Sequence, residues 1–141
     1  MLADLRQFVV SASTAGLTSD QAAAIAALRT AIADRMEPDV LDEGSDLPAL
    51  TYQLISNSSA HTLDGMIDGL FTPRVQIDVW AADALTRDAI SLNLKIALDG
   101  FAGSLNGNTA VDVLLWDNEI NSYEPDRKQY RAMLDFKILH H

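Results

Sequence analysis

Hydrophobic and polar residues alternate along residues 74–80. One side of this segment carries Val75, Ile77 and Val79, and the other carries Arg74, Gln76 and Asp78. This period of two predicts a β-strand with one face in the core and the other in water or against a partner. Residues 48–55, 111–123 and 130–138 have similar patterns and predict further strands.

Two other segments have the periodicity of amphipathic helices. Thr18 followed by Gln21 matches a capping box, so we expect a helix from there to about Arg35. Its buried stripe should consist of Ile25, Leu28, Ile32 and Met36. Residues 83–98 predict a second main helix, and residues 1–16 fit a short helix that ends by Gly16.

The helix expected at 83–98 has apolar residues on two nearly opposite sides. One stripe consists of Leu85, Ala89, Leu92 and Ile96, and the other of Ile90, Leu94, Leu98 and Phe101. Leaving a Leu or Ile in water forgoes about 1.5–3 kcal/mol, so both stripes should be covered. The sheet covers one of them, and the first main helix or a neighbouring subunit covers the other. The helix is the favoured cover, because a two-helix layer needs a helix–helix contact.

Turn-forming residues separate these elements. Residues 56–70 are rich in Ser, Asn, Asp and Gly and predict a long connection, and Asn106-Gly107 marks a turn within a loop at 103–108.

The predicted fold class is α+β. It has an antiparallel or mixed sheet of four to five strands, with two main helices packed on one face. At 141 residues, one domain over 1–141 is expected, with residues 1–16 as an N-terminal extension.

The excess of acidic over basic residues limits the kinds of molecule that the chain is expected to bind. The chain has 20 acidic and 10 basic residues, a net charge of −10 and no cysteine. A disulfide scaffold and thiolate metal sites are excluded, and binding to nucleic acid or to anionic lipid is disfavoured. An acidic surface suits a protein that DNA passes without sticking, although solubility explains the charge equally well. The apolar run 22–28 is far too short to cross a membrane, and no signal peptide is apparent.

Two groups of charged residues are candidates for contacts with another molecule. If the last strands pair with 74–80, one face of the sheet gathers Arg74, Asp78, Arg131, Asp135 and Lys137. Support of the sheet by cross-strand pairs, worth about 0.2–1 kcal/mol each, is the simpler interpretation, and a subunit or tube contact is the other. Segment 37–46 carries Glu37, Asp39, Asp42, Glu43 and Asp46 without a base. Its spacing does not fit a calcium loop, so it is either solvated or faces a basic partner.

The sequence contains no recognisable set of catalytic residues. His61 is the one internal histidine, placed in a predicted loop, and there is no phosphate-binding glycine loop or nucleophile turn. We therefore predict no catalytic residue, no metal site and no cofactor.

From Pro48 onward, the order of the segments resembles the tail terminator, or tail-completion, family of long-tailed bacteriophages and gene-transfer particles. The matching features are the strand at 48–55, the segment from Arg74 to Ala81, the amphipathic helix after it, Tyr123-x-Pro125, Tyr130-Arg131 and Asp135-Phe136. The resemblance covers about residues 18–139. The first 16 residues and the acidic segment 37–46 depart from it.

The resemblance implies an α+β subunit that assembles into a ring, commonly six-fold, on the head-proximal end of the tail tube. Such a ring ends polymerisation of the tail tube protein and offers the surface that joins the head–tail connector or stopper protein. DNA passes through it without specific binding. The protein would reside in the tail-neck region of the virion, after assembly in the host cytoplasm. In this setting Ile90, Leu94, Leu98 and Phe101, with the charged face, are candidates for the intersubunit or tube interface.

Two other interpretations stay open at this point. A head–tail connector or minor tail protein of the same particle would have similar small α+β architecture. A monomeric acidic domain that binds a cytosolic protein would require both stripes of the 83–98 helix to be buried within the chain.

Overall fold

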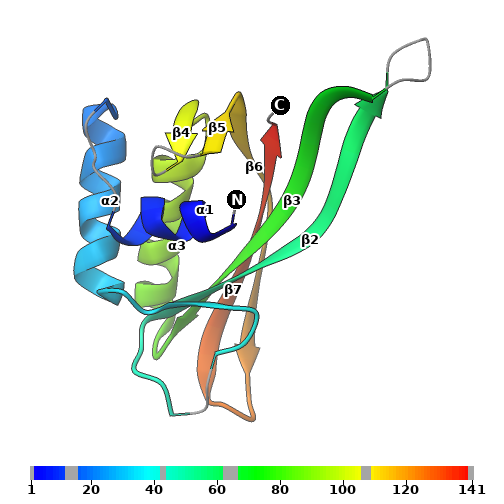
Figure 1. The fold of residues 1–141 in the computed structure, drawn as a ribbon. Helices are drawn as coiled ribbons and strands as arrows, with labels where there is room; N and C mark the ends of the chain where they lie inside the picture. The colour runs from blue at the N-terminus through cyan, green and yellow to red at the C-terminus, as the bar shows by residue number, and fades with distance from the viewer. Residues whose placement is uncertain (1, 12–15, 42–43, 62–66, 106–108, 140–141) are drawn as a thin grey trace.

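The structure is a computed structural model that describes residues 2–11, 16–41, 44–61, 67–105 and 109–139. Its elements are α1 (Leu2–Val10), α2 (Ser19–Ile32), β1 (Met36–Pro38), β2 (Ala49–His61), β3 (Ile67–Ala81), α3 (Ala84–Leu98), β4 (Gly103–Leu105), β5 (Thr109–Val111), β6 (Val113–Glu124) and β7 (Gln129–Leu139). Five strands form a mixed sheet in the order β1-β2-β3-β7-β6, and the helices lie on one side of it (Figure 1). The predicted α+β class is confirmed.

Alternation along β3 and β7 creates the core. These strands are antiparallel, with Val75 opposite Phe136, Ile77 opposite Leu134 and Val79 opposite Ala132. All of these side chains are buried in one hydrophobic cluster with residues of α2 and α3, and α3 contacts both strands. The remaining long pairs, β2 with β3 and β6 with β7, are also antiparallel, whereas the short β1 runs parallel to β2.

The beginning of α2 follows its local sequence. The Thr18 side chain accepts a hydrogen bond from the Gln21 backbone N–H, and the Gln21 side chain accepts one from the Thr18 N–H, both at 3.1 Å. The predicted capping box is therefore confirmed. The helix ends at Ile32 rather than at Arg35, and Met36 is buried from β1 instead of from the helix.

The short helix α1 is part of the same core. Leu5, Phe8 and Val9 are buried, and the Phe8 and Phe101 rings lie 4.7 Å apart between centroids. Arg29 on α2 donates hydrogen bonds to the Phe8 and Val9 carbonyls at the end of α1. Residues 2–10 thus pack against the elements that follow them.

Three expected loops contain strands instead. Residues 56–61 and 67–73 extend β2 and β3 into a long antiparallel hairpin, which projects beyond the rest of the sheet (Figure 1). The prediction of a connection over 56–70 is wrong there, because two paired strands satisfy each other's backbone groups even where the side chains favour turns. Likewise, β1 begins the acidic segment, and β4 pairs with β5 across the predicted turn, whose residues 106–108 lie outside the described part.

Candidate interaction surfaces

The sheet face opposite the helices carries a network of charges. The register places Arg74 opposite Lys137 and Gln76 opposite Asp135, so the five charged residues predicted to share this face do share it. Arg131 contacts Asp78 through two nitrogens, with Nη2 at 2.5 Å and Nε at 3.1 Å from Oδ2. Asp78 is only 5% exposed, so this pairing compensates a carboxylate that is largely removed from water.

A sixth residue, Asp117, joins this network. Arg74 lies 3.1 Å from Asp117 and Lys137 lies 3.5 Å from it. The sequence pattern did not single out Asp117, because a register shift between Trp116 and Asn118 breaks the alternation of β6. Burial raises the pKa of Asp135, Arg74 lowers it, and the like charges of Asp117 and Asp78 raise it further.

Trp80 anchors the other end of the same face. Its indole N–H donates to the Thr51 hydroxyl at 3.1 Å, and the guanidinium groups of Arg127 and Arg131 lie 5.0 and 4.7 Å from its ring centroid. Arg127 also donates to the Leu41 carbonyl at 2.8 Å, so the β6–β7 turn holds the segment that follows β1.

The acidic segment itself is only partly described. Glu37, Asp39 and Asp46 are exposed, which leaves them accessible to solvent or to a partner. Asp42 and Glu43 lie outside the described residues. The proposal that this segment faces a basic partner therefore stays a prediction.

The two stripes of α3 have different environments. Ile90, Leu94, Leu98 and Phe101 are at most 6% exposed and pack in the chain's own core, where α3 contacts α2, β3 and β7. This corrects the expectation that these four residues face another subunit or the tube, because the sheet and the neighbouring helices already cover them.

The opposite stripe of α3 lies at the surface. Leu85 is 84% exposed and Leu92 is 54% exposed, and Ala89 and Ile96 are also exposed. The favoured expectation, that the first main helix covers this stripe, is therefore wrong, and the alternative of a neighbouring subunit stays a prediction. The reason is geometric: α2 packs beside α3 rather than on top of it (Figure 1).

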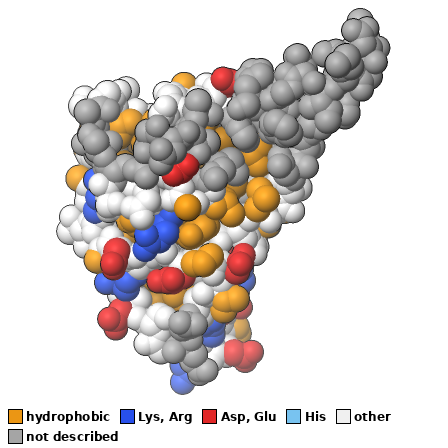
Figure 2. Space-filling model, viewed as in Figure 1, with side chains coloured by type: hydrophobic (Ala, Val, Ile, Leu, Met, Phe, Trp, Pro, Cys, Tyr) orange, Lys and Arg blue, Asp and Glu red, His pale blue; other side chains and the backbone are white. Residues whose placement is uncertain are grey.

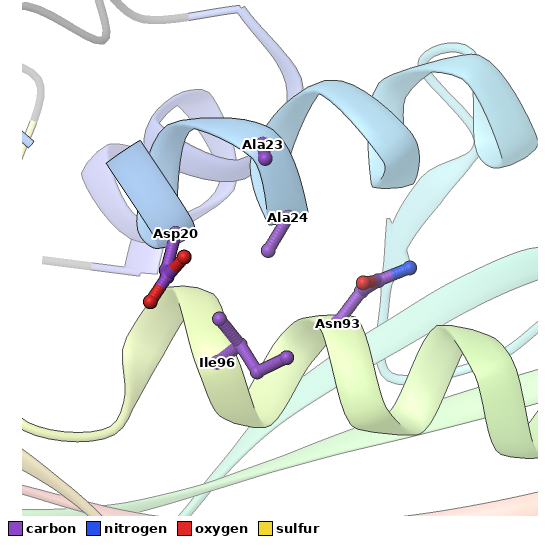
Figure 3. Close-up of a pocket in the computed structure, with 5 residues that line it drawn as sticks. All are labelled: Asp20, Ala23, Ala24, Asn93 and Ile96. Carbon is purple, nitrogen blue, oxygen red and sulfur yellow. The ribbon is translucent and has the colours of Figure 1, made fainter. Parts of the chain in front are cut away.

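A groove runs between α2 and α3 next to this exposed stripe. Its volume is about 440 Å³, and it is lined by Asp20, Ala23, Ala24, Asn93 and Ile96 (Figure 3). The alanines keep the α2 side shallow, Ile96 supplies an apolar floor from α3, and the Asp20 carboxylate stands at the α2 N-terminal end (Figure 3).

The sheet has two long edges without a neighbouring strand in the described residues. One is β6, whose Leu115, Trp116, Ile120 and Tyr123 side chains are between 39% and 53% exposed. The other is β2 beyond Tyr52, where the three-residue β1 ends; Leu54 and Ile55 are exposed there. Unpaired backbone N–H and C=O groups along such edges are templates for another strand.

In the part of the chain that the structure describes, no three His, Cys, Asp or Glu residues are arranged to hold a metal ion. His61, expected in a loop, lies instead in β2. Among the described helices, none is both long and apolar enough to cross a membrane.

On the face shown in Figure 2, acidic and basic side chains intermingle around a group of hydrophobic ones.

These features define a small α+β subunit whose distinctive surfaces are open strand edges and an apolar helix face. No curated protein matches the sequence. The fold is similar to that of a chain in the virion of a native gene transfer agent (GTA) particle. The sequences are 16% identical, 88% of this chain and 86% of that chain are covered, and the TM-score is 0.60. At that identity the likeness concerns the fold.

The family of the chain follows from its sequence. Residues 18–141 match the family described as Tail completion protein gp17, and the chain belongs to that family. It is therefore a structural protein of a phage-like tail and a component of the virion, where it assembles with other tail proteins.

Proposed function

We propose that the chain forms a ring, six-fold as in the family it resembles, that caps the head-proximal end of the tail tube. One ring face complements the last ring of tube protein. The other lacks a site for a further tube subunit and instead presents the surface that joins the head–tail connector. The role needs no catalytic residue or cofactor.

The observation that carries this proposal is the pair of open edges at opposite ends of one sheet. The four long strands β2, β3, β7 and β6 alternate in direction, so β2 and β6 run antiparallel to each other. Rotation about an axis roughly parallel to the strands preserves strand direction. The β6 edge of one copy therefore meets the β2 edge of the next in the antiparallel sense, which gives a head-to-tail contact that closes into a ring.

The side chains along β6 support the same contact. Leu115 and Ile120 project from the charged face of the sheet, and Trp116 and Tyr123 project from the helix face, by the register with β7. Exposing large apolar side chains to water on both faces of an edge strand costs free energy, and a neighbouring strand would cover them. Glu119 and Glu124 on this strand already pair with Lys95 and Arg131 of the same chain, which lowers the charge that opposes a neighbour.

In such a ring the helices lie outside and the charged sheet face lines the channel. The bases of that face, Arg74, Arg131 and Lys137, are all paired with carboxylates. A lining of this kind offers DNA phosphates few cations to bind, which suits passage without specific binding.

Light scattering on the purified protein over a concentration series, with negative-stain images, tests the proposal. We expect rings of about six times the 15.3 kDa chain mass, either with the protein alone or after addition of tail tube protein. A monomer at every concentration, unchanged when tube protein is added, would contradict it.

A further inference from the structure

The outer surface of α3 has no role in the ring contact described above. We define this outer α3 surface as the exposed stripe Leu85, Ala89, Leu92 and Ile96 together with the adjoining α2–α3 groove. The stripe spans eleven residue steps, which is about 16 Å at 1.5 Å per residue, or three helical turns. An apolar face of that length on a surface helix is typical of a docking surface for another helix.

The charges around this surface are acidic. Asp20 stands in the groove, Asp83 lies just before α3, and Asp88 flanks the stripe one position before Ala89; all three carboxylates are exposed. Of the two basic residues of α3, Lys95 pairs with Glu119 over the Trp116 ring and turns toward the sheet. Arg87 lies against the Tyr130 ring and also pairs with Asp88 at 2.9 Å, which leaves Asp20 and Asp83 as the rim carboxylates without an ion pair in the described part of the chain.

A second copy of the chain would have almost no unpaired basic side chain to place against the acidic residues around this surface. All ten basic residues lie in the described part, and nine bond within the chain. Arg6, Arg29, Arg35 and Arg127 donate to backbone carbonyls, and Arg74, Arg87, Lys95, Arg131 and Lys137 pair with carboxylates. The tenth, Lys128, stands in the exposed β6–β7 turn. A second copy facing this surface would bring carboxylates against carboxylates, which is unfavourable.

We propose that the outer α3 surface docks an amphipathic helix of a different protein of the particle, with apolar residues flanked by Lys or Arg. The apolar residues of that helix fill the α2–α3 groove and cover Leu92 and Ile96. Its basic residues meet Asp20 and Asp88. The contact is heterotypic and separate from the strand edges, so the ring can form without it.

A photoreactive amino acid in place of Leu92, in the full chain assembled into particles, tests this directly. We expect a cross-link to a different particle protein, at a residue that has Lys or Arg within about one helical turn. A cross-link mainly to another copy of this chain, or no cross-linked protein at all, would overturn the proposal.

Variants in the same assay separate the apolar part from the charged part. Leu85→Ser with Ile96→Ser should reduce the cross-link yield about tenfold or more, because each removes apolar area that the partner would bury. Asp20→Lys with Asp88→Lys should reduce it several-fold. The matched charge change Asp34→Lys with Asp126→Lys, at exposed carboxylates outside this surface, should leave the yield unchanged. A yield that responds equally to both charge changes would also overturn the proposal.

Discussion

Asp78 is a carboxylate in the middle of the sheet that water scarcely reaches. Arg131 donates two N–H groups to its Oδ2, and the Gln76 side-chain amide donates to Oδ1 at 2.7 Å. A charge in such a place is tolerated only when it is paired and hydrogen-bonded. The stability of the sheet therefore depends on Arg131 more than on the exposed ion pairs nearby.

Replacing Arg131 with Met should lower the free energy of unfolding by about 3 kcal/mol or more, because it leaves the Asp78 charge buried and uncompensated. Urea unfolding at neutral pH measures this. Arg74→Met is the matched control: Asp117 keeps Lys137, and both partners are about one-third exposed, so the loss should stay below about 1 kcal/mol. Equal losses in the two variants would contradict the assignment.

Asp135 should make stability depend on pH. Its pKa is raised in the folded chain, mainly by burial, so the folded state favours the protonated form and the ionised form costs stability. Asp135→Asn should therefore be more stable than the wild type at pH 7. The difference should shrink as the pH falls toward the ordinary aspartate pKa of about 3.9. Urea unfolding at several pH values checks this, and a difference that grows on acidification would refute it.

Among the elements, β6 belongs both to the sheet of its own chain and to the proposed contact with the next copy in the ring. Its inner edge pairs with β7 over its whole length, and its outer edge has no neighbouring strand in the described residues. Edge strands of soluble proteins are commonly protected by lysines, prolines or bulges. Here the bulge at Asp117 interrupts the first half only, and residues 118–124 remain regular without a lysine or proline.

Introducing a lysine on that edge should prevent ring formation without unfolding the subunit. Ile120 is 53% exposed, so Ile120→Lys should leave circular dichroism and the unfolding midpoint nearly unchanged while light scattering reports monomers. Leu85→Lys places the same charge on the exposed stripe of α3 and should still form rings. Rings formed by Ile120→Lys would argue against a contact through the β6 edge.

The elements also differ in how far sequence alone predicts them. The start of α2 depends on Thr18 and Gln21, which act on each other locally, so the pattern was sufficient. The gathering of Arg74, Asp78 and Arg131 on one face follows from alternation once the strands pair. The extension of β2 through residues 56–61 was missed, because a partner strand outweighs the turn preference of Ser and Asn. The outcome for the α3 stripes depended on where α2 packs, which no local signal specifies.

At the scale of the whole molecule, the distribution of charge suits the two proposed kinds of contact, those between copies of the chain and those with other proteins, in different ways. Most basic side chains bond within the chain, either to backbone carbonyls or to carboxylates, and the excess acidic side chains remain at the surface. The proposed contacts between copies therefore use backbone edges, where side-chain charge matters least. Contacts with other proteins fit acidic surfaces that a basic partner can match.

The capping role is tested most directly by the growth of tail tubes. Purified tail tube protein is allowed to polymerise, this protein is added in excess, and tube lengths are followed by negative-stain microscopy, with Ile120→Lys added to a parallel sample. We predict that wild-type protein stops elongation and leaves added density at one end of each tube, while the variant lets growth continue. Tubes that elongate equally with and without the wild-type protein would contradict the proposed function.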